Sequence, residues 1–348
     1  MRLSLIIPVH NGREVLPRCL EGIARGARAP DEVIVVDDGS DDDTGAVVRA
    51  HGATLVAVAG PPRGPAAARN RGAARATGDV LVFVDADVVV HADMLSRVAA
   101  TFETDPGLHA LFGSYDDNPA ASGTVSRFKN LLHHYVHQHS KRDAGSFWAA
   151  CGAIRREAFV TAGGFDERYA KPSVEDIELG IRLKRAGLSI RLCPEIQVTH
   201  LKRWSLMGLW RTDVLARAVP WTRLLLREGS LPDELNLTWR SRVSALVVSV
   251  AASLLLTTLV LLALREATPA GEAALGAATC LLASTFLNLE LYRFFVRRGG
   301  VRFAAGCWLL HHVYLVYSCA VFAVLVTWDG VAWRAAPRAA RHARHGTP

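Results

Sequence analysis

The feature that most constrains the fold is an uncharged, apolar run of 22 residues, Val243–Leu264. A helix of this length reaches across ~30 Å of hydrocarbon, so the run predicts a membrane-spanning helix. A second uncharged run, Phe303–Trp328, includes two Trp and two Tyr, as in spans with aromatic residues at the membrane surfaces. Between them, Ala273–Leu291 is apolar but interrupted by Asn288 and Glu290. We therefore expect two or three transmembrane helices within residues 243–328.

Charge is unevenly placed along the 348 residues, whose formal net charge is +7. Residues 1–200 hold 23 Lys and Arg against 25 Asp and Glu, whereas residues 201–348 hold 17 against 8. A basic half suits nucleic acid or an anionic membrane surface, and the apolar runs of the same half favour a membrane and no nucleic acid. The six cysteines form no CxxC pair, so we expect reduced thiols and no zinc site.

The expected organisation has four parts. Residues 1–200 form a catalytic domain, 201–242 an amphipathic segment at the membrane surface, 243–328 the transmembrane helices, and 329–348 a basic tail. In the second part, Trp and Leu alternate with Arg as in a helix lying among lipid headgroups, with a break expected at Pro220.

No signal peptide is visible at the N-terminus, so we expect a multi-pass protein of the inner membrane with a cytoplasmic catalytic domain. Counting arginines leaves the number of spans open. A three-span arrangement places one group of four arginines inside and a second group outside, and a two-span arrangement reverses this. The first group is Arg293, Arg297, Arg298 and Arg302, and the second is Arg334, Arg338, Arg341 and Arg344.

Strand and helix patterns alternate through the first 200 residues, which predicts an α/β fold with a parallel sheet. Buried strands are expected at Leu3–Val9, Glu32–Asp37, Ala53–Val58, Val80–Val84 and Leu108–Phe112. Helices are expected at Glu14–Ala27, Thr44–His51, Pro65–Ala76, Asp93–Thr104 and Val174–Ala186. Ligands of such sheets bind at the carboxyl ends of the strands.

Acidic side chains stand at two of these strand ends and at one helix start. Asp37 and Asp38 follow one strand, where they suit hydrogen bonds from a base or a ribose. Asp85 and Asp87 follow another, and residues two apart on an extended segment project to one face. Such a pair suits Mg²⁺ or Mn²⁺. Glu175 and Asp176 begin a helix, where a carboxylate is favoured by the helix dipole and is also a candidate general base.

These motifs, in this order, resemble the inverting glycosyltransferases of family 2, which have the GT-A fold, in their membrane-anchored bacterial type. The matching stretches are LSLIIPVHN, DEVIVVDDGSDDDT, GPAAARNRGAARATGDVLVFVDADV, CGAIRREAFVTAGGFDE and SVEDIELGIRLKRAG. The resemblance implies a GT-A domain followed by transmembrane helices, and a hexosyltransferase-like enzyme.

Residue roles follow from the same resemblance. Asp176 matches the catalytic base and Glu175 its companion, while Asp85, Asp87 and His200 match metal ligands. The implied donor and acceptor contacts are Pro8, His10, Asn11, Glu14, Asp37, Asp38, Arg69, Asn70, Asp85, Gly164, Phe165, Arg203 and Trp204. The implied cofactor is Mg²⁺ or Mn²⁺, and the implied partners are a nucleotide-diphosphate sugar, a lipid or glycan acceptor, and the membrane.

Three alternatives stay open from sequence: a polyprenyl-phosphate sugar synthase, a nucleotidyltransferase on a similar fold, and a non-catalytic scaffold. His200 stands where processive members have Gln, which leaves processivity open. Trp204 suits either stacking on a sugar or anchoring at the membrane surface. The histidines at 133, 134, 137 and 139 favour a solvated or lipid-facing helix stripe over a metal site.

Overall fold

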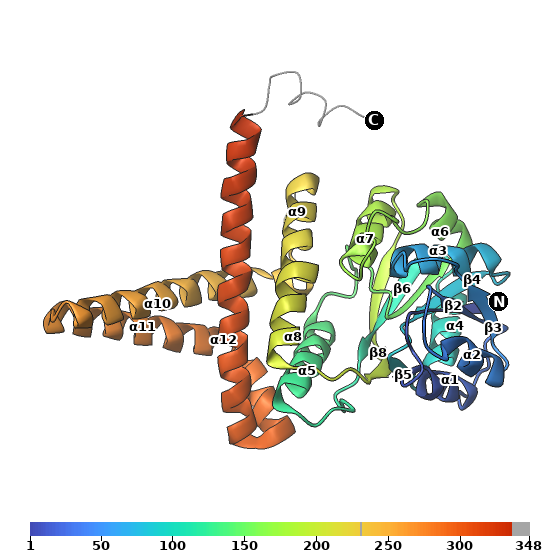
Figure 1. Ribbon diagram of the computed structural model, residues 1–348, viewed down its shortest axis with the longest axis horizontal. Helices are drawn as coiled ribbons and strands as arrows, with labels where there is room; N and C mark the ends of the chain where they lie inside the picture. Colours follow the sequence, from blue (N-terminus) through green and yellow to red (C-terminus); the bar gives the residue numbers. More distant parts are fainter. Residues whose placement is uncertain (230–231, 336–348) are drawn as a thin grey trace. The chain divides into compact units, whose positions relative to one another are not determined.

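The computed structural model describes residues 1–229 and 232–335 and divides the chain into two compact units (Figure 1). The first unit holds Met1–Leu209 together with Glu234–Asn236, and the second holds Trp210–Asp233 and the chain from Leu237 onward. Most of the expected basic tail lies outside the described residues.

An eight-stranded sheet forms the centre of the first unit, in the order β3-β2-β1-β4-β7-β6-β8-β5. Its strands are β1 Leu3–Val9, β2 Glu32–Asp37, β3 Thr54–Ala57, β4 Val80–Val84, β5 Val88–Val90, β6 Ala110–Tyr115, β7 Cys151–Arg155 and β8 Ile190–His200. The expected α/β class is confirmed, but the expectation of a purely parallel sheet is wrong. β7 runs antiparallel between β4 and β6, and β5 runs antiparallel to β8. β5 has only three residues, too few to show a strand pattern.

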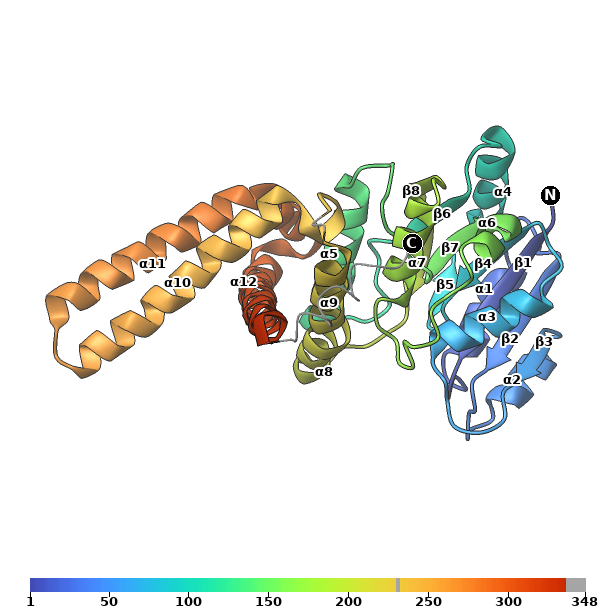
Figure 2. The same ribbon diagram turned by 90° about the horizontal axis from the view of Figure 1, so that it is seen from above.

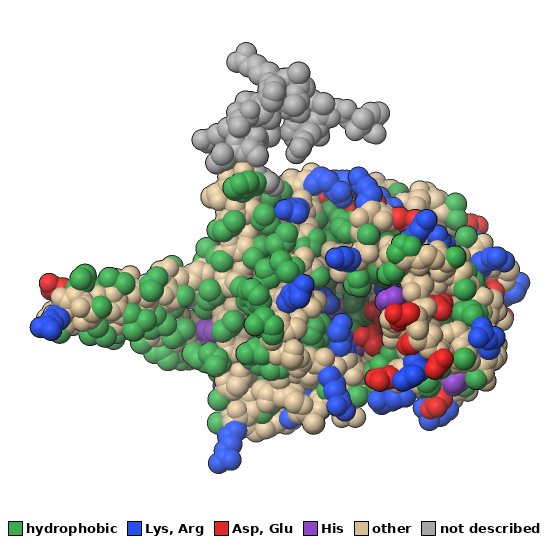
Figure 3. All heavy atoms as spheres, in the orientation of Figure 1, with side chains coloured by type: hydrophobic (Ala, Val, Ile, Leu, Met, Phe, Trp, Pro, Cys, Tyr) green, Lys and Arg blue, Asp and Glu red, His purple; other side chains and the backbone are tan. Residues whose placement is uncertain are grey.

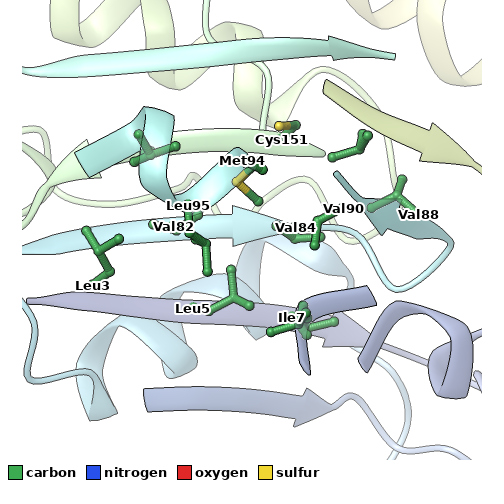
Figure 4. Close-up of a cluster of buried hydrophobic side chains, with 14 of the residues drawn as sticks. Leu3, Leu5, Ile7, Val82, Val84, Val88, Val90, Met94, Leu95 and Cys151 are labelled. Atoms are coloured by element: carbon green, nitrogen blue, oxygen red, sulfur yellow. The ribbon is translucent and has the colours of Figure 1, made fainter. Parts of the chain in front are cut away.

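Helices cover both faces of this sheet (Figure 2). They are α1 Leu16–Ala24, α2 Thr44–Ala50, α3 Pro65–Arg75, α4 Met94–Thr104, α5 Thr124–His139, α6 Arg156–Thr161 and α7 Glu175–Arg185. Successive strand side chains point to opposite faces, and this alternation builds two cores. Leu5 and Ile7 pack with α1 and α4 in one core (Figure 4). Ile6 packs with α3, α6 and α7 in the other.

The second unit is helical. Its elements are η1 Thr212–Ala218, α9 Val219–Glu228, η2 Leu235–Leu237, α10 Trp239–Ala263, α11 Ala267–Leu287 and α12 Leu289–Ala335, with α8 Leu206–Arg211 preceding them at the unit boundary and η2 shared with the first unit. Among the described residues, three helices are long and apolar enough to cross a membrane: Trp239–Ala263, Ala267–Leu287 and Leu289–Trp328. A membrane association of this unit follows from length and composition.

The helix break expected at Pro220 does not occur. Pro220 lies in the first turn of α9, and the Thr212–Ala218 segment directly before it adopts π-helical hydrogen bonding, which accommodates the missing backbone N–H. The chain therefore stays helical through this point. A kink is found instead at Gly300 in α12, where φ is 76°.

Candidate active site

The predicted site residues that follow β1, β2 and β4 lie at one edge of the sheet. β1 pairs in parallel with both β2 and β4, so the carboxyl ends of the three strands face the same way. Pro8 lies within β1 opposite Val36, and Glu14 is exposed ahead of α1. The segments after β1, β2 and β4 carry the remaining predicted residues of this edge.

The segments after β1 and β2 hold each other through backbone hydrogen bonds. The Asn11 backbone N–H donates to Ser40 Oγ at 2.8 Å, and Asn11 adopts a left-handed φ of 53°. His10 Nδ1 lies 3.1 Å from the Asp38 carbonyl oxygen, while Asp37 Oδ1 accepts from Ser40 N at 2.9 Å. A rigid polar turn results, in which the His10 and Asn11 side chains are exposed.

The Asp38 carboxylate is buried and already engaged by the protein. Its Oδ2 accepts from the backbone N–H groups of Arg63 and Gly64 at 2.9 and 2.7 Å. These residues lie directly before α3, so Asp38 orders the loop that leads into that helix. Its predicted contact with a nucleobase stays a prediction.

Arg69 of α3 joins two of the acidic motifs. Its Nη2 donates to Asp85 Oδ1 at 2.7 Å and its Nη1 donates to Glu175 Oε1 at 2.9 Å. Both Arg69 and Glu175 are 4% exposed, and the guanidinium lies over the Phe165 ring. A buried charge is tolerated only with such partners, so Arg69 links the end of β4 to the start of α7.

Asp176 lies next to this ion pair at the start of α7. Its Oδ2 accepts from the Ala149 backbone N–H at 3.2 Å and its Oδ1 from Ile177 N at 2.8 Å. Burial, followed by the neighbouring Glu175 charge, raises the pKa of Asp176 from 3.8 to about 7, against the opposing effect of Arg69. A carboxyl group with this pKa is half ionised near neutral pH and suits general base catalysis far better than an ordinary Asp.

Asp87 is paired differently from Asp85. Its carboxylate Oδ2 lies 3.6 Å from Nε2 of His200, the last residue of β8, and β8 pairs with β5 just after Asp87. Burial opposes ionisation of Asp87, but the hydrogen bond and charge of His200 and the charge of Lys202 leave its pKa below the ordinary value. Tyr115 stacks on the His200 ring at 4.3 Å between centroids and orients the imidazole.

This donor set fits a divalent cation with two protein ligands. Carboxylate and imidazole together suit Mn²⁺, and the remaining positions suit phosphate and water. Among the described residues, no three His, Cys, Asp or Glu side chains converge as a complete metal site. Asp85 is oriented toward Arg69, so Asp87 and His200 are the better candidate ligands.

Asn70 organises the predicted acceptor loop. Its Oδ1 accepts from Phe165 N at 2.8 Å, and its Nδ2 donates to Phe165 O at 2.8 Å and to Glu167 Oε1 at 3.0 Å. Gly164 adopts a φ of 70°, and a Cβ there would lie 2.7 Å from Asn70 Oδ1. The glycine is therefore required both for its backbone conformation and for this close approach.

Two further predicted residues lie in the chain just after β8. Arg203 is exposed, and the Trp204 backbone N–H donates to Ser126 Oγ of α5 at 2.8 Å. The Lys202 ammonium lies 4.5 Å from the Trp204 ring centroid. Half-burial of this indole leaves part of the ring accessible, and its contact with an acceptor stays a prediction.

Sequence reasoning missed an aromatic cluster beside His200. Tyr115 at the end of β6 and Trp148 just before β7 contact edge to face, with ring centroids 4.8 Å apart. His133 packs against both rings. The sequence signal that could have revealed this cluster is the presence of an aromatic residue at the ends of two strands.

The prediction of a solvated or lipid-facing histidine stripe is wrong for His134 and His137 of α5, whereas His139 is exposed. His134 and His137 are 8% and 4% exposed, because their Nδ1 atoms bond the Tyr115 and Gly113 carbonyl oxygens at 2.8 and 2.9 Å. The burial of His137 lowers its pKa to about 4. These side chains fasten α5 to β6.

The fold and this edge define a class of protein, the transferases of the GT-A fold. A family model described as glycosyl transferase family 2 matches residues 4–161. Glycosyltransferase AglE of Haloferax volcanii is 30% identical over 209 residues, which cover 58% of this chain and 67% of that protein. The chain therefore belongs to glycosyltransferase family 2, and the expected family, fold and enzyme class are confirmed.

Other relatives share only part of their length. The pre-mycofactocin glycosyltransferase of Mycobacterium tuberculosis strain H37Rv is 32% identical over 222 residues, 59% of this chain and 43% of that protein. The chain spans about half or less of the first curated relatives it matches, between 43% and 50%. A mannosyltransferase of Pyrobaculum calidifontis, solved with GDP-Man and Mn²⁺, shares the fold over 92% of this chain and 87% of its own, with a TM-score of 0.55 and 19% identity.

Proposed function

We propose that the chain transfers a sugar from a nucleotide-diphosphate sugar to an acceptor hydroxyl, with Asp176 as the general base. The observation that carries this proposal is the half-buried Asp176 carboxyl group, which two backbone N–H groups hold beside the buried Arg69–Glu175 pair. A pKa of about 7 lets it accept a proton from an attacking alcohol at neutral pH.

The arrangement supports inversion at the anomeric carbon. Retention needs a second carboxylate free to attack the sugar, whereas inversion needs only one base. Glu175, the neighbour of Asp176 in sequence, and Asp85 are both bound by Arg69. Neither is therefore available as a nucleophile, and Asp176 remains as the single base.

The proposed binding site for the sugar donor lies at the carboxyl ends of the strands. Asp87 and His200 would hold Mg²⁺ or Mn²⁺, which supplies Lewis-acid stabilisation of the leaving diphosphate. Arg69 keeps Asp85 in place beside them. Solved relatives of the same fold bind GDP-Man with Mn²⁺ and UDP-GlcNAc, in support of a nucleotide sugar as donor here.

The acceptor is proposed to be lipid-linked. In support, three described helices are long and apolar enough to cross a membrane, and Lys202 and Trp204 lie in the chain between β8 and the helical unit. We place the catalytic domain on the cytoplasmic side of the inner membrane, where nucleotide sugars are found.

The test uses membranes that contain the full chain, a panel of labelled nucleotide sugars, and Mn²⁺. Label from one donor is expected in the lipid extract, and Asp176→Asn should lower its transfer by ~10²–10⁴-fold. Asp93→Asn, an exposed carboxylate paired with Arg97 on α4, is the matched control and should stay active.

Two outcomes would count against the proposal. Label confined to water-soluble products would refute the lipid acceptor. Near-normal transfer by Asp176→Asn would refute the base and favour an acceptor phosphate, which needs no strong base, as in a polyprenyl-phosphate sugar synthase.

A further inference from the structure

The helical unit contains two parts of opposite character. The first is the hairpin of α10 and α11, which has no charged side chain between Val243 and Leu264 and one, Glu272, within α11. Its far end carries charges, at Arg265 and Glu266 in the turn between the helices (Figure 3). A hairpin returns to its starting side, so its two ends share one side of any bilayer that it crosses.

The base of the hairpin is joined to the start of α12. Trp308 Nε1 donates to Thr285 Oγ1 at 2.9 Å, and Asn288, between α11 and α12, donates to Ser244 Oγ at 2.9 Å. The buried residues of α10 end at Ala251, and beyond it the leucines are largely exposed. Figures 1 and 2 agree that α12 runs across the hairpin rather than alongside it.

The second part consists of η1 and α9 together with α12, which lies beside them. Tyr317 Oη of α12 donates to Asp213 Oδ2 of η1 at 2.8 Å, and Asp213 also pairs with Arg217. The η1–α9 segment and the residue before it carry four arginines, Arg211, Arg217, Arg223 and Arg227. Because α12 and this segment run side by side, they share one orientation with respect to the bilayer.

That shared orientation decides which helices can cross. An arginine at the centre of a bilayer costs ~2.5–3.5 kcal/mol on the biological insertion scale, so a crossing that draws η1 and α9 with it is strongly disfavoured. The α10–α11 hairpin carries no such cost. Arginine-rich helices with apolar faces are instead stable in the headgroup plane.

We propose that α10 and α11 alone span the bilayer, and that α12 lies along the membrane surface with η1 and α9, on the side of the hairpin's base. The chain belongs to the catalytic unit at Glu234–Asn236, directly before α10 starts, so the base is the catalytic side. All eight arginines of the two groups at residues 293–302 and 334–344 then lie on that one side. Neither sequence-based arrangement placed more than four there.

One face of α12 is suited to contact with lipid. Phe303, Cys307, His311 and Leu315 are buried on the face toward the protein, at helical spacing. Leu309 and Val313 are 59% and 47% exposed on another face, which would meet the acyl boundary of the bilayer. The partner is thus the surface of the membrane itself, and it does not depend on which sugar is transferred.

The test measures on which side of sealed vesicles three introduced cysteines react with a membrane-impermeant maleimide. The variants of the full chain are Glu103→Cys in the catalytic unit, Thr268→Cys at the far end of the hairpin, and Thr347→Cys in the tail. Labelling of the unmodified chain, which has six cysteines, is subtracted, and permeabilised vesicles show that each new thiol can react.

The proposal expects positions 103 and 347 to label from the same side and position 268 from the opposite side. Labelling of 347 together with 268 would show that α12 crosses the bilayer and would overturn the proposal. Labelling of 268 together with 103 would show that the hairpin does not cross and would overturn it equally. Transfer activity of each variant reports that the chain is folded.

Discussion

Replacing Asp176 by Asn should stabilise the protein while it removes activity. Burial raises the pKa of the folded-state Asp176 from 3.8 to about 7. Between about pH 4 and pH 7 the folded protein therefore keeps a proton that the unfolded chain has released, and its stability falls as pH rises through this window. Asn carries no charge at any pH and avoids this loss.

The magnitude follows from the width of the window. Each pH unit in it is worth ~1.36 kcal/mol, so the advantage of Asn over Asp should grow by about 2–3 kcal/mol from about pH 5 to about pH 8. The hydrogen bond from Ala149 or Ile177 that Asn cannot accept costs roughly 1 kcal/mol, but this cost is the same at both pH values.

The assay is thermal unfolding of the detergent-solubilised full chain at the two pH values. For a unit of this size, the gain in stability of Asp176→Asn over wild type should widen the gap between their unfolding midpoints by roughly 5–10 °C from the lower to the higher pH. Asp93→Asn, the exposed control, should show no such change. If the unfolding midpoints of Asp176→Asn and wild type differ by the same amount at both pH values, the raised pKa of Asp176 is refuted.

Three further predictions follow from the site. Arg69→Met leaves two carboxylates without their buried partner and should lower the free energy of unfolding by ~3–5 kcal/mol in denaturant titration, whereas a loss below ~1 kcal/mol would contradict the ion-pair assignment. Gly164→Ala forces a Cβ to 2.7 Å from Asn70 Oδ1 at a positive φ, and should destabilise the acceptor loop by ~1–3 kcal/mol. Hydrogen exchange of the backbone amides in that loop measures the loss. Gly163→Ala is the comparison, because a Cβ at Gly163 has no atom within 4 Å. His200→Ala should raise the Mn²⁺ concentration needed for half-maximal transfer at least ~10-fold, and an unchanged requirement would exclude His200 as a ligand.

The local elements and the acidic motifs were predictable because their signals are short in range. β1, β2 and β4 begin and end where their apolar runs predict, and α3 and α7 agree within about one residue at either end. Aspartates directly after buried strands must lie at a sheet edge, so the neighbourhood of Asp38 and Asp85 followed from the pattern alone. The family motifs then supplied candidate roles.

Strand order and long-range pairing were not predictable, since they depend on which distant segments bury each other. β7 enters the sheet antiparallel between β4 and β6, although nothing in its five residues indicates this direction. The two bonds of Arg69 join positions 16 and 106 residues away. The burial of His137 likewise depends on a carbonyl group 24 residues distant.

The sequence by itself determined a two-part chain, because uncharged runs of membrane-spanning length and acidic strand ends are local properties of composition and period. Only the tertiary structure decided how those parts are used. It turned Asp176 from an ordinary carboxylate into a group poised near neutral pH, since desolvation acts only after distant segments have packed around it. It also packed α12 beside the arginine-bearing helix α9, and this contact cannot be inferred from the hydrophobicity of the chain alone.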